Sequence, residues 1–327
     1  MIRLEDTSGT AVAAAIAAER HRQGSPTTGM VLTLLILASE EHQEEATSAA
    51  VHAARQHPMR IITVIPRHSG HDDRPQLDAL VFVGGDEGPG EIAILRLRGS
   101  LAEHAGSVVI PLLLPDTPIV AFWPGDAPHD PSEDPIGRHA SRRITDTASG
   151  HGRPPLDLLI ERADTYSPGD TDLAWTRLTA WRTVLAGSLD ALPTPEVTAV
   201  SIEAGPDLPT ARLLSAWLGL RLQCPVSIAD VDSRHIESVV LATADGPIEV
   251  HRSDIEPGAD PQRDRPTSPL PERWQNATFT RPGSPATGIM LPIRGLDELL
   301  AEELRHLGPD DEYGDVLAAF REDRNPN

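Results

Sequence analysis

Two short apolar runs, separated by an alanine-rich segment, constrain the fold of this chain more than any other feature of its sequence. Residues Gly29–Ala38 and Arg60–Ile65 are short and continuously apolar, which is typical of buried central strands. Between them, residues Glu41–His57 carry alanines at helical spacing, with acidic residues early and Arg55 late, as the helix dipole favours. Pro58 ends this helix. The order of strand, helix and strand predicts a βαβ unit with a right-handed crossover.

The same order returns in the second half of the chain. A strand at Glu196–Ala204, a helix at Leu208–Leu218 and a strand at Val226–Val231 predict a second βαβ unit. After it, Asp245-Gly246 joins two β-like segments, His235–Ala244 and Pro247–His251, and predicts a hairpin.

The length of the chain, 327 residues, favours two domains, because single cores stop growing at roughly 250–300 residues. We expect an N-terminal α/β domain over residues 1–164 and a C-terminal α/β domain over residues 165–327. The second contains an exposed proline-rich loop at 253–273. The predicted fold class is α/β, with two α/β domains whose mixed, largely buried sheets are flanked by helices.

Other segments complete this expectation. We predict helices at Thr10–Gln23, Leu156–Ala163, Asp172–Leu189, Leu296–Leu307 and Asp311–Asp323, and strands at Leu77–Val83, Glu91–Arg98 and Ile119–Trp123. A glycine-rich turn, Gly84–Gly90, resembles a dinucleotide-binding loop. That motif needs a helix directly after the glycines, whereas a strand-like segment follows here, so we expect a plain hairpin turn.

Charge excludes several classes of function. The formal net charge is −21, and the chain contains no lysine, so all 28 basic residues are arginines. Chemistry that requires lysine is therefore excluded, and binding to nucleic acids or to anionic membranes is disfavoured.

The acidic N-terminus is unlike a signal peptide, so we expect a cytoplasmic protein. A polar cluster at His68–Asp73 is read as a solvated loop, and no metal or cofactor is expected. The single cysteine, Cys224, is expected to be an inert thiol.

The densest group of informative residues runs from Tyr166 to Arg182. On the predicted helix, Asp172, Trp175 and Arg182 fall on one stripe, which suits recognition of a sugar, a phosphate or a partner protein. The alternative is structural: the aspartates cap the helix, Arg182 pairs with an acid, and the tryptophans pack in an interface. The candidate residues of this block are Asp170, Asp172, Trp175, Arg177, Trp181 and Arg182.

A second cluster lies upstream, where a predicted strand ends at Trp123 before a rigid Pro124-Gly125 turn. Soon after it come Arg142, Arg143 and Asp146. Two adjacent arginines in a protein this acidic predict a local anion site, and ordinary surface salt bridges are an equal alternative.

At these residues the sequence resembles the OpcA family of bacterial glucose-6-phosphate dehydrogenase assembly proteins, from Met30 to about Val250. The resemblance is carried by Trp123-Pro124-Gly125, by Arg142-Arg143-Ile144-Thr145-Asp146 and by the Tyr166–Arg182 block. This chain has Ala121-Phe122-Trp123 where the family often has paired tryptophans, and Ala180 where proline is expected, so we predict a smooth helix there. Redox control through cysteine would require Cys224 and a second molecule.

The resemblance implies a protein that is not an enzyme and that uses no cofactor. It implies an assembly factor or allosteric activator that binds glucose-6-phosphate dehydrogenase in the oxidative pentose phosphate pathway, supporting NADPH production. The chain contains no Gly-x-Ser-x-Gly motif and no phosphate-loop motif, which agrees with this. The alternative is a sugar-phosphate-binding protein or enzyme that uses the Asp170–Arg182 face. A sugar-phosphate effector is compatible with both hypotheses.

Overall fold

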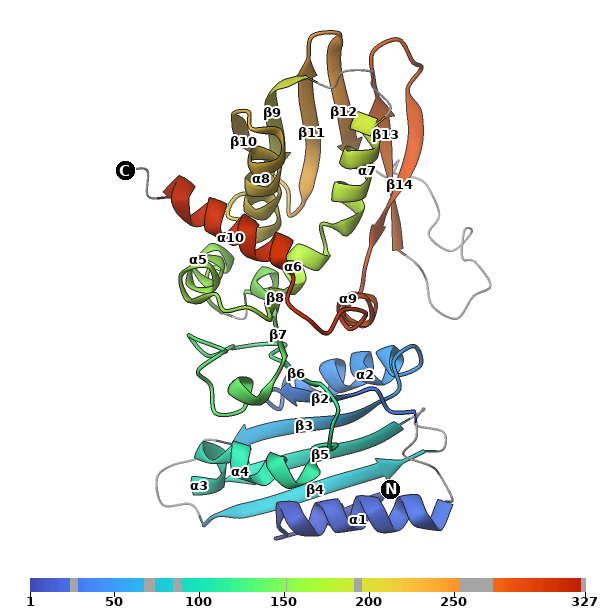
Figure 1. The fold of residues 1–327 in the computed structure, drawn as a ribbon, viewed down its shortest axis with the longest axis vertical. Helices are drawn as coiled ribbons and strands as arrows, with labels where there is room; N and C mark the ends of the chain where they lie inside the picture. Colours follow the sequence, from blue (N-terminus) through green and yellow to red (C-terminus); the bar gives the residue numbers. More distant parts are fainter. Residues whose placement is uncertain are drawn as a thin grey trace. The chain divides into compact units, whose positions relative to one another are not determined.

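The computed structural model of the protein describes residues 1–23, 29–67, 74–84, 90–150, 152–190, 196–252 and 273–324. These residues form two compact units (Figure 1). Unit 1 comprises Met1–Gly152, Thr165–Leu173 and Leu296–Asp311, and unit 2 comprises Arg153–Asp164, Ala174–Gly295 and Glu312–Asn327. The predicted domains were continuous segments that divide at residues 164 and 165, whereas each compact unit draws on three separate segments of the chain.

Unit 1 is built on an eight-stranded sheet in the order β1-β4-β5-β3-β2-β6-β7-β8. Strands β5, β3, β2, β6, β7 and β8 are mutually parallel, and β4 and β1 continue the sheet in antiparallel fashion. The strands are β1 (Ile2–Leu4), β2 (Leu32–Leu37), β3 (Met59–Arg67), β4 (Gln76–Val83), β5 (Gly90–Arg98), β6 (Ile119–Phe122), β7 (Arg142–Thr145) and β8 (Asp170–Asp172).

Helices cover both faces of this sheet. On one face, α1 (Gly9–Gln23), α3 (Ser100–Glu103) and α4 (Ala105–Val109) bury a core that includes Val12, Leu35 and Leu95. On the other face, α2 (Gln43–Ala53) and α9 (Leu296–Glu303) pack on β2 and β3. Short 3-10 turns follow at Ile110–Leu112, Gly137–His139 and Thr147–Ser149. The alanines of α2 allow this helix to lie close to the sheet.

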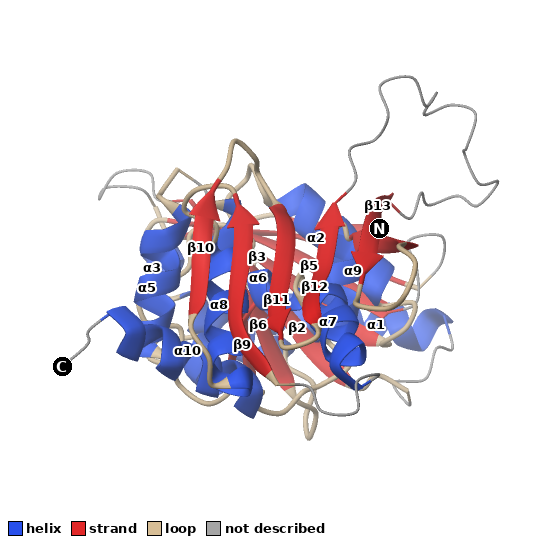
Figure 2. Ribbon diagram, turned by 90° about the horizontal axis from the view of Figure 1, so that it is seen from above, coloured by secondary structure: helices blue, strands red, loops and turns tan. Residues whose placement is uncertain are grey.

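Unit 2 contains a six-stranded sheet in the order β10-β9-β11-β12-β13-β14, in which only β9 and β10 pair in parallel. Helix α8 packs against β9 and β10, and α7 lies near β14. Figure 2 shows these helices behind strands β10, β9, β11 and β12. The elements are α5 (Pro155–Thr165), α6 (Leu173–Thr176), α7 (Thr179–Asp190), β9 (Val197–Ala204), α8 (Pro209–Leu222), β10 (Val226–Asp230), β11 (Ile236–Thr243), β12 (Gly246–Arg252), β13 (Arg273–Thr280), β14 (Thr287–Ile293) and α10 (Asp311–Arg324).

The structure confirms the predicted α/β class, both βαβ units and both hairpins. One prediction was wrong: no single helix runs from Asp172 to Leu189. Residues Asp170–Asp172 form β8, and a turn at Arg177 and Leu178 separates α6 from α7. The extended conformation of β8 comes from its pairing with β7, a tertiary effect that helix periodicity cannot reveal.

Other differences are smaller. The strands β1, β7, β8, β13 and β14 were not predicted. The predicted proline-rich loop lies outside the described residues up to residue 272, and Arg273 begins β13. The polar cluster at 68–73 and most of the glycine-rich turn also lie outside them.

Candidate functional site

A cleft of about 910 Å³ lies at the carboxyl ends of β2 and β6 in unit 1. The chain runs from β2 to β3 on one side, and β6 later joins β2 on the other side. This is the topological switch point, the usual place for a ligand in an open α/β sheet. The cleft is lined on the β2 side by Leu37, Ser39 and His42, and on the β6 side by Trp123 and Gly125.

Acidic side chains dominate the polar lining of this cleft. Glu41, Glu103, Asp126 and Asp134 contribute carboxylates, and none of the described residues that line the cleft is a lysine or an arginine. The loop from Ala38 to His42 contains no glycine, and Glu44 and Glu45 occupy the first turn of α2. A helix N-terminus attracts phosphate through its dipole and free N–H groups, and these carboxylates oppose that attraction. The residues present therefore do not fit the pyrophosphate of a dinucleotide.

Trp123 forms part of the cleft wall and is almost completely buried, with 3% of its surface exposed. Its backbone N–H donates to the Ile144 carbonyl at 3.0 Å, which ties the end of β6 to β7. A Cβ atom at Gly137 would lie 3.1 Å from the Trp123 ring and 1.9 Å from the Pro131 carbonyl oxygen, so only glycine fits there. The neighbouring Asp134 accepts hydrogen bonds from the N–H groups of Ile136 and Gly137.

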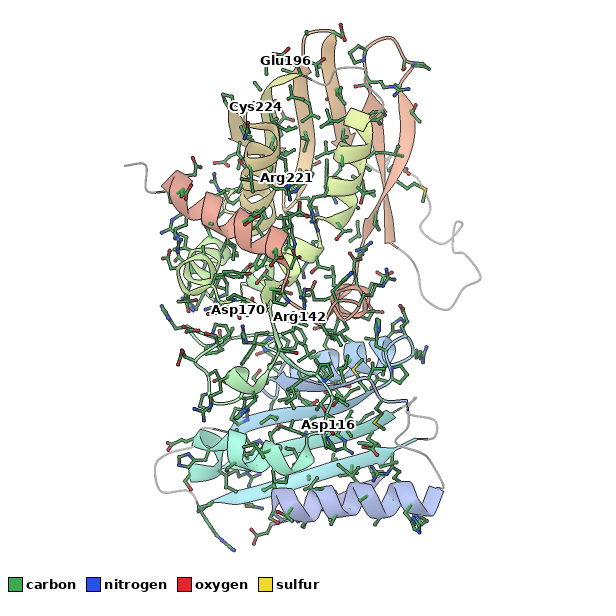
Figure 3. The ribbon with its side chains drawn as sticks, viewed as in Figure 1. Asp116, Arg142, Asp170, Glu196, Arg221 and Cys224 are labelled. Carbon is green, nitrogen blue, oxygen red and sulfur yellow. The ribbon has the colours of Figure 1, made fainter. Side chains whose placement is uncertain are left out.

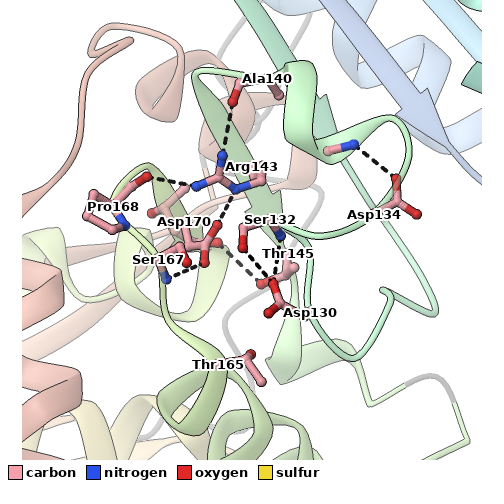
Figure 4. Close-up of polar contacts among 12 residues, drawn as sticks. Asp130, Ser132, Asp134, Ala140, Arg143, Thr145, Thr165, Ser167, Pro168 and Asp170 are labelled. Atoms are coloured by element: carbon pink, nitrogen blue, oxygen red, sulfur yellow. Dashed lines mark hydrogen bonds and ion pairs between the residues drawn. The ribbon is translucent and has the colours of Figure 1, made fainter.

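Arg143, predicted as part of an anion site, is paired within unit 1 (Figure 4). Its guanidinium forms a buried ion pair with Asp170 and donates to the carbonyl oxygens of Ala140 at 3.0 Å and Pro168 at 2.7 Å. The Ser167 N–H donates to the second carboxylate oxygen of Asp170 at 2.8 Å. These contacts fix the turn before β8, and they engage the Arg143 guanidinium and the Asp170 carboxylate within the protein.

Arg142 is directed to α9 and not to a ligand. It is 3% exposed, pairs with Glu303 and also donates to the Gly308 carbonyl. Figure 3 marks Arg142 and Asp170 within the ribbon. The adjacent arginines therefore form two buried ion pairs, whereas the alternative to an anion site had been salt bridges at the surface.

Asp172 is fully buried, and its carboxylate accepts hydrogen bonds from two threonines. The donors are the hydroxyl of Thr145 at 2.6 Å, and the N–H and hydroxyl of Thr147 at 3.0 Å and 2.9 Å. Asp146 accepts a hydrogen bond from the Ser149 hydroxyl at 2.6 Å. These carboxylates fix the segment between β7 and α5. Asp170 and Asp172 lie in β8, directly before α6, and not at the start of one long helix.

The remaining predicted residues of this block lie in unit 2, where Arg182 pairs with Glu312. The Arg182 guanidinium stacks on the Trp175 ring, 3.7 Å from its centroid, and pairs with Glu312 at 3.3 Å. The Trp217 indole and Arg221 donate to the same carboxylate at 2.8 Å each. Trp181 is buried, and Arg177 lies in the turn between α6 and α7. The structure thus divides the predicted stripe between the two units.

Glu303 and Glu312 were missed at the sequence level. Each closes an ion-pair network with arginines that lie 91 to 161 residues earlier in the chain. Both glutamates are on ordinary acidic helices, so no local signal distinguishes them.

Cys224 is partly buried, and burial raises the pKa of its thiol above 9.0, which agrees with an unreactive side chain.

The Glu312 network predicts a pH dependence of stability. Burial opposes ionisation of Glu312, but the hydrogen bonds from Trp217 and Arg221 and the nearby positive charges outweigh it, so its pKa is below 4.5. A depressed carboxyl pKa stabilises the folded state above the unfolded pKa, and this stabilisation is lost as the pH falls through the folded pKa. We expect Glu312→Gln to lower the melting temperature at pH 7, and the difference from wild type to shrink below pH 4.5. Calorimetric scans across this range check the result; a difference that is independent of pH would contradict it.

The described residues also bear on metal binding and on membrane insertion. Within the described ranges, no group of three or more His, Cys, Asp or Glu side chains is placed to hold a metal ion. None of the helices that the structure describes is both long and apolar enough to cross a membrane.

Two family models match the chain. One, described as the glucose-6-phosphate dehydrogenase subunit N-terminal domain, matches residues 50–162, and the other, described as the C-terminal domain, matches residues 168–317. The fold and the site define the chain as an α/β protein of two compact units. The cleft at the topological switch point of its first sheet, between β2 and β6, is lined by acidic residues. The chain belongs to the OpcA family, whose models name glucose-6-phosphate dehydrogenase assembly.

Comparisons with other proteins show a distant likeness in fold. Two crystal structures of KijD10, a 3-ketoreductase from Actinomadura kijaniata in complex with TDP-benzene and NADP, are each 10% identical to this chain. One is a mutant, with a TM-score of 0.46, covering 89% of this chain and 95% of that one. The other is an open conformation, with a TM-score of 0.45 and coverages of 89% and 94%. Similarity at this level carries no inference about activity. No curated protein sequence matches the chain.

Proposed function

We propose that this protein is a non-catalytic assembly factor and allosteric activator that binds glucose-6-phosphate dehydrogenase and shifts it toward its active state. The observation that carries the proposal is the pair of family models, which between them match most of the chain from residue 50 to residue 317. The proposal places the protein in the cytoplasm, at the entry to the oxidative pentose phosphate pathway, where it supports NADPH production.

The residues of unit 1 support a role other than nucleotide chemistry. The switch-point cleft carries carboxylates where the phosphates of a dinucleotide would need N–H groups and positive charge. The arginines and aspartates that the sequence singled out are occupied in buried ion pairs and hydrogen bonds. In the proposal they are positioning residues, which hold the partner-binding surfaces of each unit in shape.

The proposed mechanism is preferential binding. If the protein binds the active conformation or oligomer of the dehydrogenase more tightly than the inactive one, it shifts the equilibrium by that difference in affinity and no more. A tenfold preference corresponds to about 1.4 kcal/mol. The protein needs no reactive group of its own for this effect.

Initial-rate measurements on the dehydrogenase test the proposal. Added protein is expected to raise the maximal rate or lower the KM for glucose 6-phosphate, and to saturate at a fixed ratio of the two chains. Heat-unfolded protein serves as the control for crowding and carry-over. An unchanged rate and KM over all ratios, at enzyme concentrations that span its oligomeric states, would contradict the proposal.

The alternative function placed a sugar phosphate on the Asp170–Arg182 face. In the structure, Asp170 and Asp172 are bound by Arg143, Thr145 and Thr147 in unit 1, and Arg182 pairs with Glu312 in unit 2. No observation favours a ligand among these side chains, so this alternative is not carried forward.

A further inference from the structure

Four arginines gather around one cavity on the sheet of unit 1, at the end formed by β1, β4 and β5. The cavity has a volume of about 300 Å³, and the charged residues that line it in the described part of the chain are Arg3, Arg67, Arg96, Arg98 and Asp78. Such a concentration of positive charge is unexpected in a chain whose formal net charge is −21.

Strand pairing explains why these side chains meet. Arg96 lies opposite Asp78 across β5 and β4, and Arg98 lies opposite Arg67 across β5 and β3. Residues two apart along a strand share a face, so Arg96 and Arg98 point to the same side. The intervening positions, such as Leu95 and Leu97, are buried in the core beneath α1. Alternation along β5 thus separates an apolar face from an arginine-bearing one.

The guanidinium groups are accessible. The side chains of Arg3, Arg67 and Arg96 are 72%, 37% and 25% exposed. An apolar side chain, Leu80, lies opposite Arg3 across β4 and β1 and lines the cavity beside the charged groups. A small ligand can therefore contact both an apolar wall and several positive charges.

The nearby carboxylates do not cancel the arginines. Glu40 accepts hydrogen bonds from both Arg67 and Arg96, at 2.7 Å each, so one negative charge is shared by two positive ones. Asp78 accepts from the Asp6 N–H and the Gln76 amide, each at 3.0 Å. The Arg3–Glu5 pair is exposed, at 3.0 Å, and pairs of this kind contribute little and exchange readily. Arg98 and Arg3 lie near Asp78, and their charges favour its ionised form and lower its pKa. Among the described residues, four guanidinium groups therefore meet the carboxylates of Glu5, Glu40 and Asp78, which leaves one positive charge in excess.

We propose that this cavity binds the phosphate group of a small phosphorylated metabolite. Guanidinium groups present forked N–H donors that match phosphate oxygens, and several of them around one concave site favour a doubly charged anion. The cavity volume is at the lower end of small-molecule sites, which suits a ligand the size of a sugar phosphate. The site is separate from the switch-point cleft, and the inference does not depend on the proposed function.

Calorimetric titration of the full chain tests this site with three probes: glucose 6-phosphate, inorganic phosphate and glucose. We expect heat of binding from the two phosphate compounds and none from glucose. Arg98→Gln is expected to weaken binding about tenfold, because a hydrogen bond to a charged group is lost. Arg3→Gln, at an exposed position that the fold does not need, is expected to act in the same direction. Arg55→Gln, an exposed position on unit 1 outside the cavity lining, is the matched control and should bind as wild type does.

A further variant is expected to change the affinity for phosphate in the opposite direction. Asp78→Asn removes a negative charge from the cavity lining, and is expected to strengthen phosphate binding severalfold. Circular dichroism verifies that each variant is folded. The proposal is overturned if neither phosphate compound binds at millimolar concentration, if glucose binds equally well, or if folded Arg98→Gln and Arg3→Gln bind phosphate as tightly as the control.

Discussion

Replacing Arg142 by methionine is expected to lower the free energy of unfolding by about 3–5 kcal/mol, because it leaves a buried glutamate without its counter-charge. Arg142 and Glu303 are 3% and 6% exposed, and the Arg142 Nε atom lies 3.1 Å from a Glu303 carboxylate oxygen. Arg142 also satisfies the carbonyl of Gly308, so the loop after α9 loses a donor as well. Chemical denaturation followed by circular dichroism measures the change.

A double replacement separates the ion pair from its surroundings. Glu303→Leu alone should destabilise by a similar amount, since it leaves Arg142 buried and unpaired. The combined Arg142→Met and Glu303→Leu chain contains no uncompensated charge at this position. Its loss of stability should therefore be well below the sum of the two single losses. Losses that simply add would show that the pair is not coupled in the folded protein.

Asp172→Asn is the second substitution with a large expected effect, a loss of about 3 kcal/mol of stability. The side chain keeps its shape, but an amide nitrogen replaces one oxygen and meets donors from Thr145 or Thr147. Since the site is fully buried, water cannot satisfy these groups.

The matched control is Asp126→Asn, which makes the same chemical change at an exposed position in unit 1. Its stability should stay within about 0.5 kcal/mol of wild type. Thermal unfolding of the two variants side by side gives the comparison. Equal melting temperatures would mean that the Asp172 carboxylate is not held as the structure shows.

Most of the layered architecture follows from local sequence patterns. The apolar run that forms β2, the alanines of α2 and the proline after that helix each act within a few residues, so reading them locally is sufficient. Strand β8 is different, since two of its three residues are aspartates, a residue type that is depleted in strands. Its conformation is set by β7 and by Arg143, which pairs with Asp170 across the sheet.

The candidate sites were less predictable for the same reason. Arg142 and Arg143 stand out in the sequence, yet their roles depend on Glu303 and Asp170, and Glu303 is 161 residues from Arg142. The switch-point cleft depends on β6 joining β2, which short-range patterns do not reveal. The arginine cavity requires the register of β1, β3, β4 and β5, although its residues are visible in the sequence as isolated charges.

Sedimentation velocity on the dehydrogenase, with and without an equimolar amount of this protein, tests the central claim most directly. The account predicts a new, faster species that contains both chains, together with a redistribution of the enzyme among its oligomers in parallel with its activity. Two independent boundaries at the positions of the separate proteins, with the oligomer distribution of the enzyme unchanged, would contradict it.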